Sequence, residues 1–105
     1  MKEISVQELK KKIDDKEDFQ LIDVREEYEF EICNLNGELI PMAYVLENVD
    51  KISREKPVIV YCKSGRRSAV IIIELEKRFG FTNLYNLKGG ILEYAKEVDP
   101  TLEQY

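Results

Sequence analysis

A short apolar run that ends in a cysteine constrains the fold of this chain more than any other feature. Residues 57–61 (Pro-Val-Ile-Val-Tyr) are rich in β-branched side chains and too few for a helix, and Cys62 follows them directly. After a short loop, residues 68–79 form an apolar-rich segment of helical length that stops at Gly80. The order of strand, loop and helix predicts a strand that is buried on both faces, as in a parallel sheet covered by helices.

The rest of the chain alternates in the same way. Ser5 and Glu8 have the spacing of a capping box, which predicts a helix from Val6 to about Asp14. Further helices are expected over residues 25–32, 44–52 and 91–98, and further strands over residues 19–24, 38–41 and 83–87. This order predicts an α/β fold, with a mostly parallel central sheet of about five strands flanked by helices on both faces. With 105 residues and no internal repeat, residues 1–105 are expected to form a single domain.

Two of the expected helices have informative apolar patterns. In the segment 68–79, the five consecutive apolar residues from Ala69 to Ile73 make the first half apolar on nearly every side, so this helix is expected to lie deep in the fold. In the segment 44–52, Val45, Val49 and Ile52 share one helical face, which predicts an amphipathic helix packed on the core.

Charge and composition narrow the classes of function. The net charge is −5, which argues against nucleic-acid binding, because a phosphate backbone is bound by clustered Lys and Arg. The longest apolar run, Ala69 to Ile73, is far too short to span a membrane, and the N-terminal segment has no signal-peptide core. Two cysteines without a secretory signal favour a reducing, cytoplasmic location. No histidine is present, so a His-based triad is excluded, and we expect a monomer without metal or other cofactor.

Cys62 is the candidate nucleophile, because its loop has the features that stabilise a thiolate. The loop leads into a helix N-terminus, where backbone N–H groups favour negative charge. Gly65 permits a positive φ, so that consecutive amides can face one point, and Arg66 and Arg67 add positive charge in an acidic chain. The alternative is an inert buried cysteine at a strand end, with solvated arginines beyond it.

The number of residues between cysteine and arginine separates the possible anion chemistries. Cysteine phosphatases have an arginine six positions after the nucleophile, in a loop sized for a tetrahedral phosphate, and here that position is Ser68. Arg67 instead gives a loop that is one residue shorter. The spacing therefore argues against a cysteine phosphatase or arsenate reductase, although both remain alternatives.

The loop from Cys62 to Ser68 resembles the active loop of a single-domain rhodanese, a family of sulfurtransferases. Three further stretches are similar to motifs of that family and occur in the same order. They are Leu21–Glu26, which matches a DVRE strand end; Glu29–Gly37, which matches E-Y-x-x-G-H-I-P-G; and Leu87–Gly90 with Tyr94, which matches L-x-G-G-x-x-x-W. The resemblance covers roughly residues 4–96 and implies the rhodanese-like α/β fold.

The chain departs from the family pattern at positions outside the loop. Four residues stand where the family usually has Gly, His, Pro and Trp, respectively: Cys33, Asn34, Asn36 and Tyr94. The tail from Ala95 to Pro100, together with Tyr105, looks most like the rhodanese domains fused behind adenylating enzymes. Those enzymes activate ubiquitin-like sulfur carriers.

The resemblance implies that Cys62 takes the outer sulfur of a small anionic donor, such as thiosulfate or a persulfide, and passes it to a thiol, cyanide or sulfur-carrier acceptor. In this interpretation Cys62 and Arg67 are catalytic. The expected substrate-binding residues are the rest of the loop: Lys63, Ser64, Gly65, Arg66 and Ser68. The implied protein partners are a ubiquitin-like sulfur-carrier protein or an adenylating enzyme. The alternatives are a non-catalytic docking or relay module for such a partner, and a redox pair of Cys33 with Cys62.

Residues outside the loop carry structural expectations. Asp23, at the carboxyl end of a strand, is expected to cap the following helix rather than to bind a ligand. Arg25 and Glu29 are spaced i, i+4 and are expected to form a structural ion pair. Cys33 is expected to be a small buried side chain.

Overall fold

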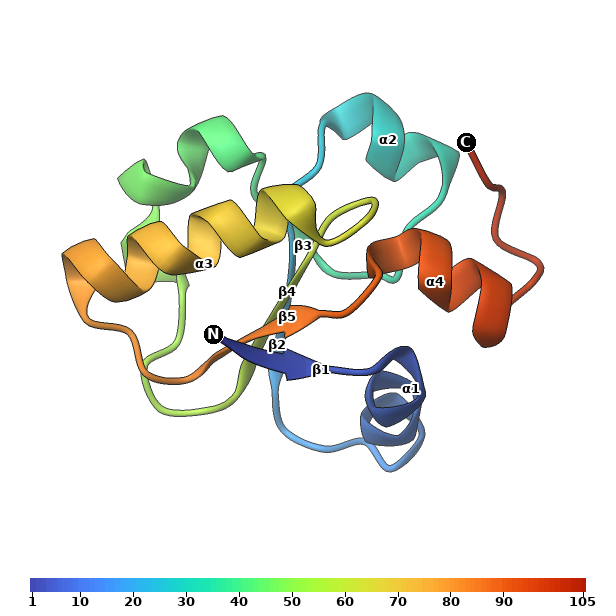
Figure 1. Ribbon diagram of the computed structural model, residues 1–105, viewed down its shortest axis with the longest axis horizontal. Coiled ribbons are helices and arrows are strands. Elements are labelled where there is room, and N and C mark those ends of the chain that lie inside the picture. The colour runs from blue at the N-terminus through green and yellow to red at the C-terminus, as the bar shows by residue number, and fades with distance from the viewer.

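Five short strands form one parallel sheet in the computed structural model, which describes residues 1–105 (Figure 1). The strands are β1 (Lys2–Ile4), β2 (Gln20–Asp23), β3 (Glu38–Leu39), β4 (Val58–Tyr61) and β5 (Leu84–Leu87). Their order across the sheet is β1-β5-β4-β2-β3, so β4 is central and all four of its residues are buried. The predicted parallel sheet and its buried central strand are confirmed. The three-residue β1 is too short to leave a pattern in the sequence.

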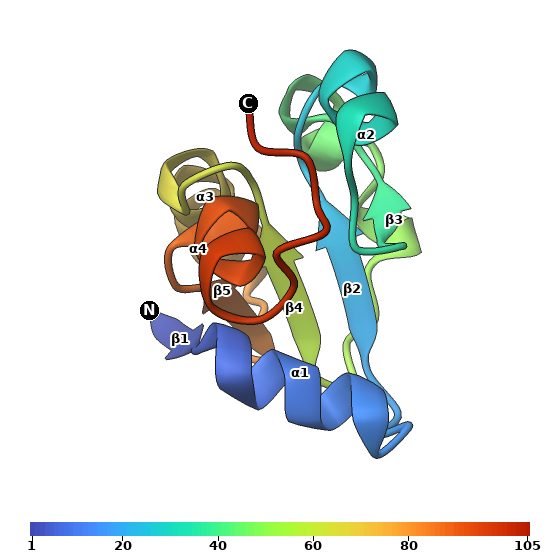
Figure 2. The same cartoon turned by 90° about the vertical axis from the view of Figure 1, so that its right-hand side faces the viewer.

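Helices cover both faces of the sheet, as predicted. They are α1 (Val6–Asp14), α2 (Glu27–Ile32), α3 (Arg66–Phe79), α4 (Gly90–Glu97) and the 3-10 helices η1 (Met42–Glu47) and η2 (Val49–Lys51). One part of the core joins α3, η1 and η2 to one face of the sheet, and a second part joins α1 and α4 to the other face (Figure 1). After α4, the tail runs toward α2 (Figure 2). None of the helices combines the length and the apolarity that crossing a bilayer requires.

The helix predicted over residues 44–52 is wrong, because the chain forms two 3-10 turns there. The Asn48 side chain donates a hydrogen bond to the Tyr44 carbonyl at 2.7 Å, and the Asn48 backbone N–H donates to Val45 instead. The asparagine side chain thereby takes the carbonyl that an α-helix would pair with the backbone of Asn48. Val45 and Ile52 still face the core, so the apolar pattern indicated burial correctly and the type of helix incorrectly.

The expectation that the first half of the helix over residues 68–79 is buried nearly all round is also wrong. Val70 is 52% exposed and Ile73 is 50% exposed, because the sheet covers only one side of α3. Ser68, Ile71 and Leu75 face inward at helical spacing. The helix also begins two residues before Ser68, at Arg66, since Gly65 adopts φ +97° and turns the chain there. Gly80 ends α3 as predicted.

The N-terminus of α4 holds the loop after β4. The backbone N–H of Ile91 donates to the Cys62 carbonyl at 3.0 Å, and that of Leu92 donates to the Lys63 carbonyl at 3.1 Å. A Cβ atom on Gly90 would overlap the Lys63 carbonyl and lie 2.6 Å from the Cys62 carbonyl oxygen. The close approach of α4 to the loop therefore requires a residue without a side chain at position 90.

We expect Gly90→Ala to destabilise the fold much more than Gly80→Ala. Both glycines have positive φ values, +64° at Gly90 and +69° at Gly80, so both substitutions carry a backbone cost of about 1–2 kcal/mol. Only Gly90 would also clash with backbone, since nothing lies within 4 Å of a Cβ at Gly80. Urea unfolding should give a loss of about 3 kcal/mol or more for Gly90→Ala. Equal losses in the two variants would contradict the proposed role of the contact.

Candidate active site

Cys62 lies at the carboxyl edge of β4, directly before the loop that leads into α3. Its Sγ accepts hydrogen bonds from the backbone N–H of Gly65 at 3.1 Å and of Ser68 at 3.5 Å, and from the Ser68 hydroxyl at 3.4 Å. The residue is only 1% exposed. The amides of the loop and of the first turn of α3 thus converge on the sulfur, as the glycine and the helix start predicted.

These contacts favour the thiolate form of Cys62. Burial acts in the opposite direction and by itself would raise the pKa of the thiol. Hydrogen bonds from the Ser68 hydroxyl and from the backbone of Ser68, Gly65 and Ser64 together outweigh burial, so the pKa of Cys62 lies below its ordinary value. The thiolate is therefore more populated at neutral pH than that of a free cysteine.

Asn86 on β5 is a member of the site that the sequence prediction missed. The Ser68 hydroxyl donates to Asn86 Oδ1 at 2.6 Å, and Asn86 Nδ2 donates to the Gly65 carbonyl at 3.0 Å. Ser68 is fully buried and Asn86 is nearly so. A polar residue next to Leu87 in a buried strand is costly unless it forms hydrogen bonds, and this is the sequence signal that could have identified it.

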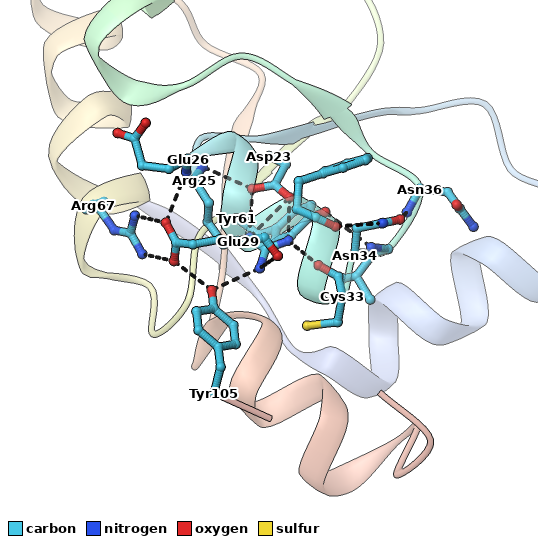
Figure 3. Close-up of polar contacts among 12 residues, drawn as sticks. Asp23, Arg25, Glu26, Glu29, Cys33, Asn34, Asn36, Tyr61, Arg67 and Tyr105 are labelled. Carbon is cyan, nitrogen blue, oxygen red and sulfur yellow. Dashed lines mark hydrogen bonds and ion pairs between the residues drawn. The ribbon is translucent and has the colours of Figure 1, made fainter. Parts of the chain in front are cut away.

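Arg67 forms a paired contact with Glu29 on α2 (Figure 3). Its Nη1 and Nη2 atoms donate to Glu29 Oε1 and Oε2 at 2.7 and 2.9 Å. Hydrogen bonds from Arg67 are the main reason that the pKa of Glu29 falls to about 2, against the opposing effect of burial. The pair raises the pKa of Arg67 in turn. This contact joins α3 to α2 beside the loop.

The expected Arg25–Glu29 ion pair is wrong, and so is the expected helix cap at Asp23. Arg25 Nη2 donates to Asp23 Oδ2 at 2.8 Å, and both side chains are fully buried (Figure 3). Asp23 Oδ1 accepts from the backbone N–H and the Nε of Arg25, so the carboxylate is already occupied. The cap of α2 is Glu26, whose backbone N–H donates to Glu29 Oε1. Arg25 reaches Glu29 only through the backbone carbonyl of that residue.

Tyr105 connects these ion pairs to the loop. Its hydroxyl donates to Glu29 Oε2 at 2.7 Å and accepts from Arg25 Nη1 at 2.9 Å (Figure 3). Lys63 Nζ lies 4.3 Å from the centroid of the Tyr105 ring, a cation–π contact. Burial is the main cause that raises the pKa of Tyr105 to about 12. No local spacing in the sequence indicates contacts between residues that are 76 to 80 positions apart.

The predicted site residues therefore fall into three groups. Cys62, Gly65 and Ser68 come together around the sulfur. Lys63 and Arg67 are held by Tyr105 and Glu29, respectively. The side chains of Ser64 and Arg66 are exposed, and Arg66 forms no ion pair.

A cavity of ≈ 480 Å³ lies beside the loop, between η1 and α3. Its walls are mainly apolar, with Met42, Leu46 and Val70 on them, and Arg67 lines one side. Cys33 lies in the other part of the core, where it is free and buried, as predicted. No cluster of three or more His, Cys, Asp or Glu side chains is placed to hold a metal ion.

Comparisons with known proteins give matches in sequence and in fold. The profile of the Rhodanese-like domain family matches residues 5–97. The Arabidopsis thaliana "Rhodanese-like/PpiC domain-containing protein 12, chloroplastic" is 37% identical over 100% of this chain and 38% of its own length. The Mycobacterium tuberculosis "Probable adenylyltransferase/sulfurtransferase MoeZ" is 33% identical over 97% of this chain and 26% of its own length. This chain thus spans well under half of either relative. A crystal structure of a rhodanese-like domain protein from Staphylococcus aureus superposes with a TM-score of 0.82, at 29% identity and with 100% and 99% of the two chains covered.

We expect Glu29→Gln to lower stability at neutral pH and to flatten its dependence on acid. Because the pKa of Glu29 is about 2 in the fold against 4.5 ordinarily, its contribution is complete above pH 4.5 and is lost as the pH falls toward 2. That difference corresponds to about 3 kcal/mol at neutral pH. Urea unfolding of both proteins between pH 7 and pH 2 measures it.

Glu27→Gln on the exposed side of the same helix is the matched control and should follow the wild type. If wild type and Glu29→Gln lost stability in parallel on acidification, the Glu29–Arg67 pair would not be the source of the effect.

Proposed function

The chain belongs to the rhodanese-like domain family, and on this premise we propose that it is a sulfurtransferase with Cys62 as the nucleophile. The observation that carries the proposal is the convergence of the Gly65 and Ser68 amides and the Ser68 hydroxyl on Cys62 Sγ. Hydrogen bonds to a sulfur anion stabilise a thiolate. The same groups therefore support the thiolate that attacks a donor and the thiolate that is released when the sulfur leaves.

The first step is attack of the Cys62 thiolate on the outer sulfur of thiosulfate. A bond forms between Cys62 Sγ and that sulfur, the sulfur–sulfur bond of the donor breaks, and its electron pair leaves with sulfite. The product is a Cys62 persulfide anion. The step follows the logic of thiol–disulfide exchange and needs no general base once the thiolate exists. A chain without histidine can therefore carry it out.

The second step passes the sulfur to an acceptor. A thiolate or cyanide attacks the outer sulfur of the persulfide, the bond to Cys62 Sγ breaks, and its electron pair returns to Cys62 as a thiolate. The apolar cavity next to Arg67 provides a surface for an acceptor near the loop. A ubiquitin-like sulfur carrier or an adenylating enzyme is the proposed protein partner, and a reducing, cytoplasmic location fits the two free thiols.

The basic residues of the loop have different proposed roles. Arg66 is exposed and unpaired, so it attracts the anionic donor through its charge. Lys63 adds to this attraction while it is held on the ring of Tyr105. Arg67 positions the loop through its ion pair with Glu29, and its positive charge also interacts electrostatically with Cys62. We therefore propose that Arg67 is a positioning residue rather than a ligand of the donor.

Incubation with thiosulfate should add the mass of one sulfur atom to the intact protein, and cyanide should remove it. Cys62→Ala should abolish the addition, because no other residue is proposed to accept the sulfur. Intact-protein mass spectrometry under non-reducing conditions measures both. Cys33→Ala is the matched control and should still take up one sulfur. An unmodified wild-type mass after exposure to excess donor would overturn the proposal.

The same variants test the alternative functions. A docking or relay module would support partner thiolation in the Cys62→Ala variant as well as in the wild type. A phosphatase would hydrolyse an aryl phosphate in a Cys62-dependent way. A Cys33–Cys62 redox pair would lose both free thiols on mild oxidation of the wild type.

Arg66→Gln should raise the KM for thiosulfate with little change in kcat, since an exposed charge contributes to encounter and not to the reacting geometry. The effect should be about threefold to tenfold at low ionic strength and should shrink as salt is added. Steady-state assays of thiocyanate formation at two salt concentrations measure it. Lys88→Gln, which removes an exposed charge outside the loop, is the control. A salt-independent loss of kcat in Arg66→Gln would contradict a purely electrostatic role.

A further inference from the structure

The hydroxyl of Ser68 has one proton and two acceptors within reach. Asn86 Oδ1 lies 2.6 Å from Ser68 Oγ, and Cys62 Sγ lies 3.4 Å from it. A hydroxyl donates one hydrogen bond at a time, so the two acceptors compete for it. The shorter distance favours the hydrogen bond to Asn86 over the one to an uncharged sulfur.

The orientation of the Asn86 amide is determined by its second contact. Asn86 Nδ2 donates to the Gly65 carbonyl at 3.0 Å, and a carbonyl can only accept. The amide oxygen must therefore face Ser68, where it can only accept as well. Asn86 cannot rotate to donate to Ser68 without leaving two acceptors facing each other at Gly65.

We propose that Asn86 is a positioning residue that holds the Ser68 proton away from Cys62 until the sulfur becomes negatively charged. In the thiol state, the Cys62 S–H donates to Ser68 Oγ, and the Ser68 hydroxyl donates to Asn86. In the thiolate state, the Ser68 hydroxyl rotates to the sulfur and leaves the nearly buried Asn86 oxygen without this donor. The Ser68 hydroxyl therefore donates to the sulfur only when the sulfur is charged. Because this donation breaks the hydrogen bond to Asn86, the net stabilisation of the thiolate is smaller than that of an unopposed hydrogen bond.

This role deepens the proposed sulfurtransferase function and rests on it for its consequence in catalysis. When an acceptor takes the outer sulfur, the electron pair of the broken bond stays on Cys62 Sγ. Rotation of the Ser68 hydroxyl toward that charge stabilises the leaving thiolate without moving a proton between residues. The same hydrogen bond stabilises the free thiolate before it attacks the donor, and competition from Asn86 limits that stabilisation, so that the thiolate keeps more of its nucleophilicity.

The surrounding charges are the same in all states considered. Arg67 acts on Cys62 from α3 and is paired with Glu29, while Asp23 and Arg25 neutralise each other at the end of β2. In the loop, Lys63 is held on Tyr105. Asn86 and Ser68 do not titrate, so a change at either position acts on Cys62 through hydrogen bonds.

The test is a double-mutant cycle on the titration of Cys62, followed by the ultraviolet absorbance of its thiolate against a Cys62→Ala blank. Asn86→Leu removes the competing acceptor, so the thiolate fraction well below the pKa should rise by about threefold to tenfold, the effect of part or all of one hydrogen bond to a charged sulfur. Ser68→Ala should lower this fraction by a similar factor. In the Ser68→Ala background, Asn86→Leu should have no further effect.

The outcome that contradicts the proposal is equally specific. If Asn86 only braced the loop, Asn86→Leu would lower the thiolate fraction, and would do so with or without the Ser68 hydroxyl. The Gly65 carbonyl keeps its hydrogen bond from the Ala69 backbone, so the leucine variant leaves no carbonyl unpaired. Asn86→Val gives the same test with a strand-forming side chain if the leucine variant does not fold.

The titration needs no sulfur donor, so it fails or succeeds independently of the sulfurtransferase proposal. If Asn86→Leu acted only in the presence of Ser68, but the wild type took up no sulfur from thiosulfate, the enzyme function would be overturned and the role of Asn86 would stand. If the wild type took up sulfur, but the effects of Asn86→Leu and Ser68→Ala were additive, the role of Asn86 would be overturned and the enzyme function would stand.

Discussion

The contact between the start of α4 and the carbonyls of the Cys62 loop is the constraint on which the site depends. A peptide group is planar, with its C=O and the following N–H pointing in opposite directions. Because the carbonyls of Cys62 and Lys63 point outward to the amides of Ile91 and Leu92, the N–H groups that follow them point inward. The Ser64 amide accordingly acts on the sulfur of Cys62. The loop of Cys62 is thus oriented by an element that is more than 25 residues away in sequence.

A second set of contacts holds the other side of the loop. Asp23, Arg25, Glu29 and Arg67 alternate in sign; the buried groups Asp23, Arg25 and Glu29 each also have a hydrogen bond with backbone, and Arg67 pairs with both carboxylate oxygens of Glu29. Buried charges are tolerated only when they are paired and saturated in this way. Tyr105 adds a neutral bridge between Arg25 and Glu29. The loop therefore sits between a helix terminus on one side and a neutralised ionic network on the other.

The sequence was sufficient for the features that depend on local pattern. The buried strand β4, the position of Cys62 at its end, the turn at Gly65 and the stop at Gly80 all follow from residue type and spacing. The partners of Arg25 and Arg67 could not be read in this way, because Glu29, at helical spacing from Arg25, binds an arginine 38 positions further along the chain. Sequence spacing indicates which charged residues could form an ion pair, and the tertiary structure determines which of these pairs form. The contacts of Tyr105 were missed for the same reason, whereas Asn86 left a signal in its polar side chain within a buried strand, which names the residue but not its partners.

The direction of Arg67 bears on which anion the loop can accept. A phosphate in such a loop needs donors for three oxygens, whereas both terminal nitrogens of Arg67 donate to Glu29. The Gly65 and Ser68 amides donate to one atom, Cys62 Sγ. A single sulfur added to Cys62 requires far fewer donors than a tetrahedral oxyanion. The shorter spacing from Cys62 to Arg67 and the pairing of Arg67 with Glu29 are two separate observations, and both agree with the proposed transfer of sulfur.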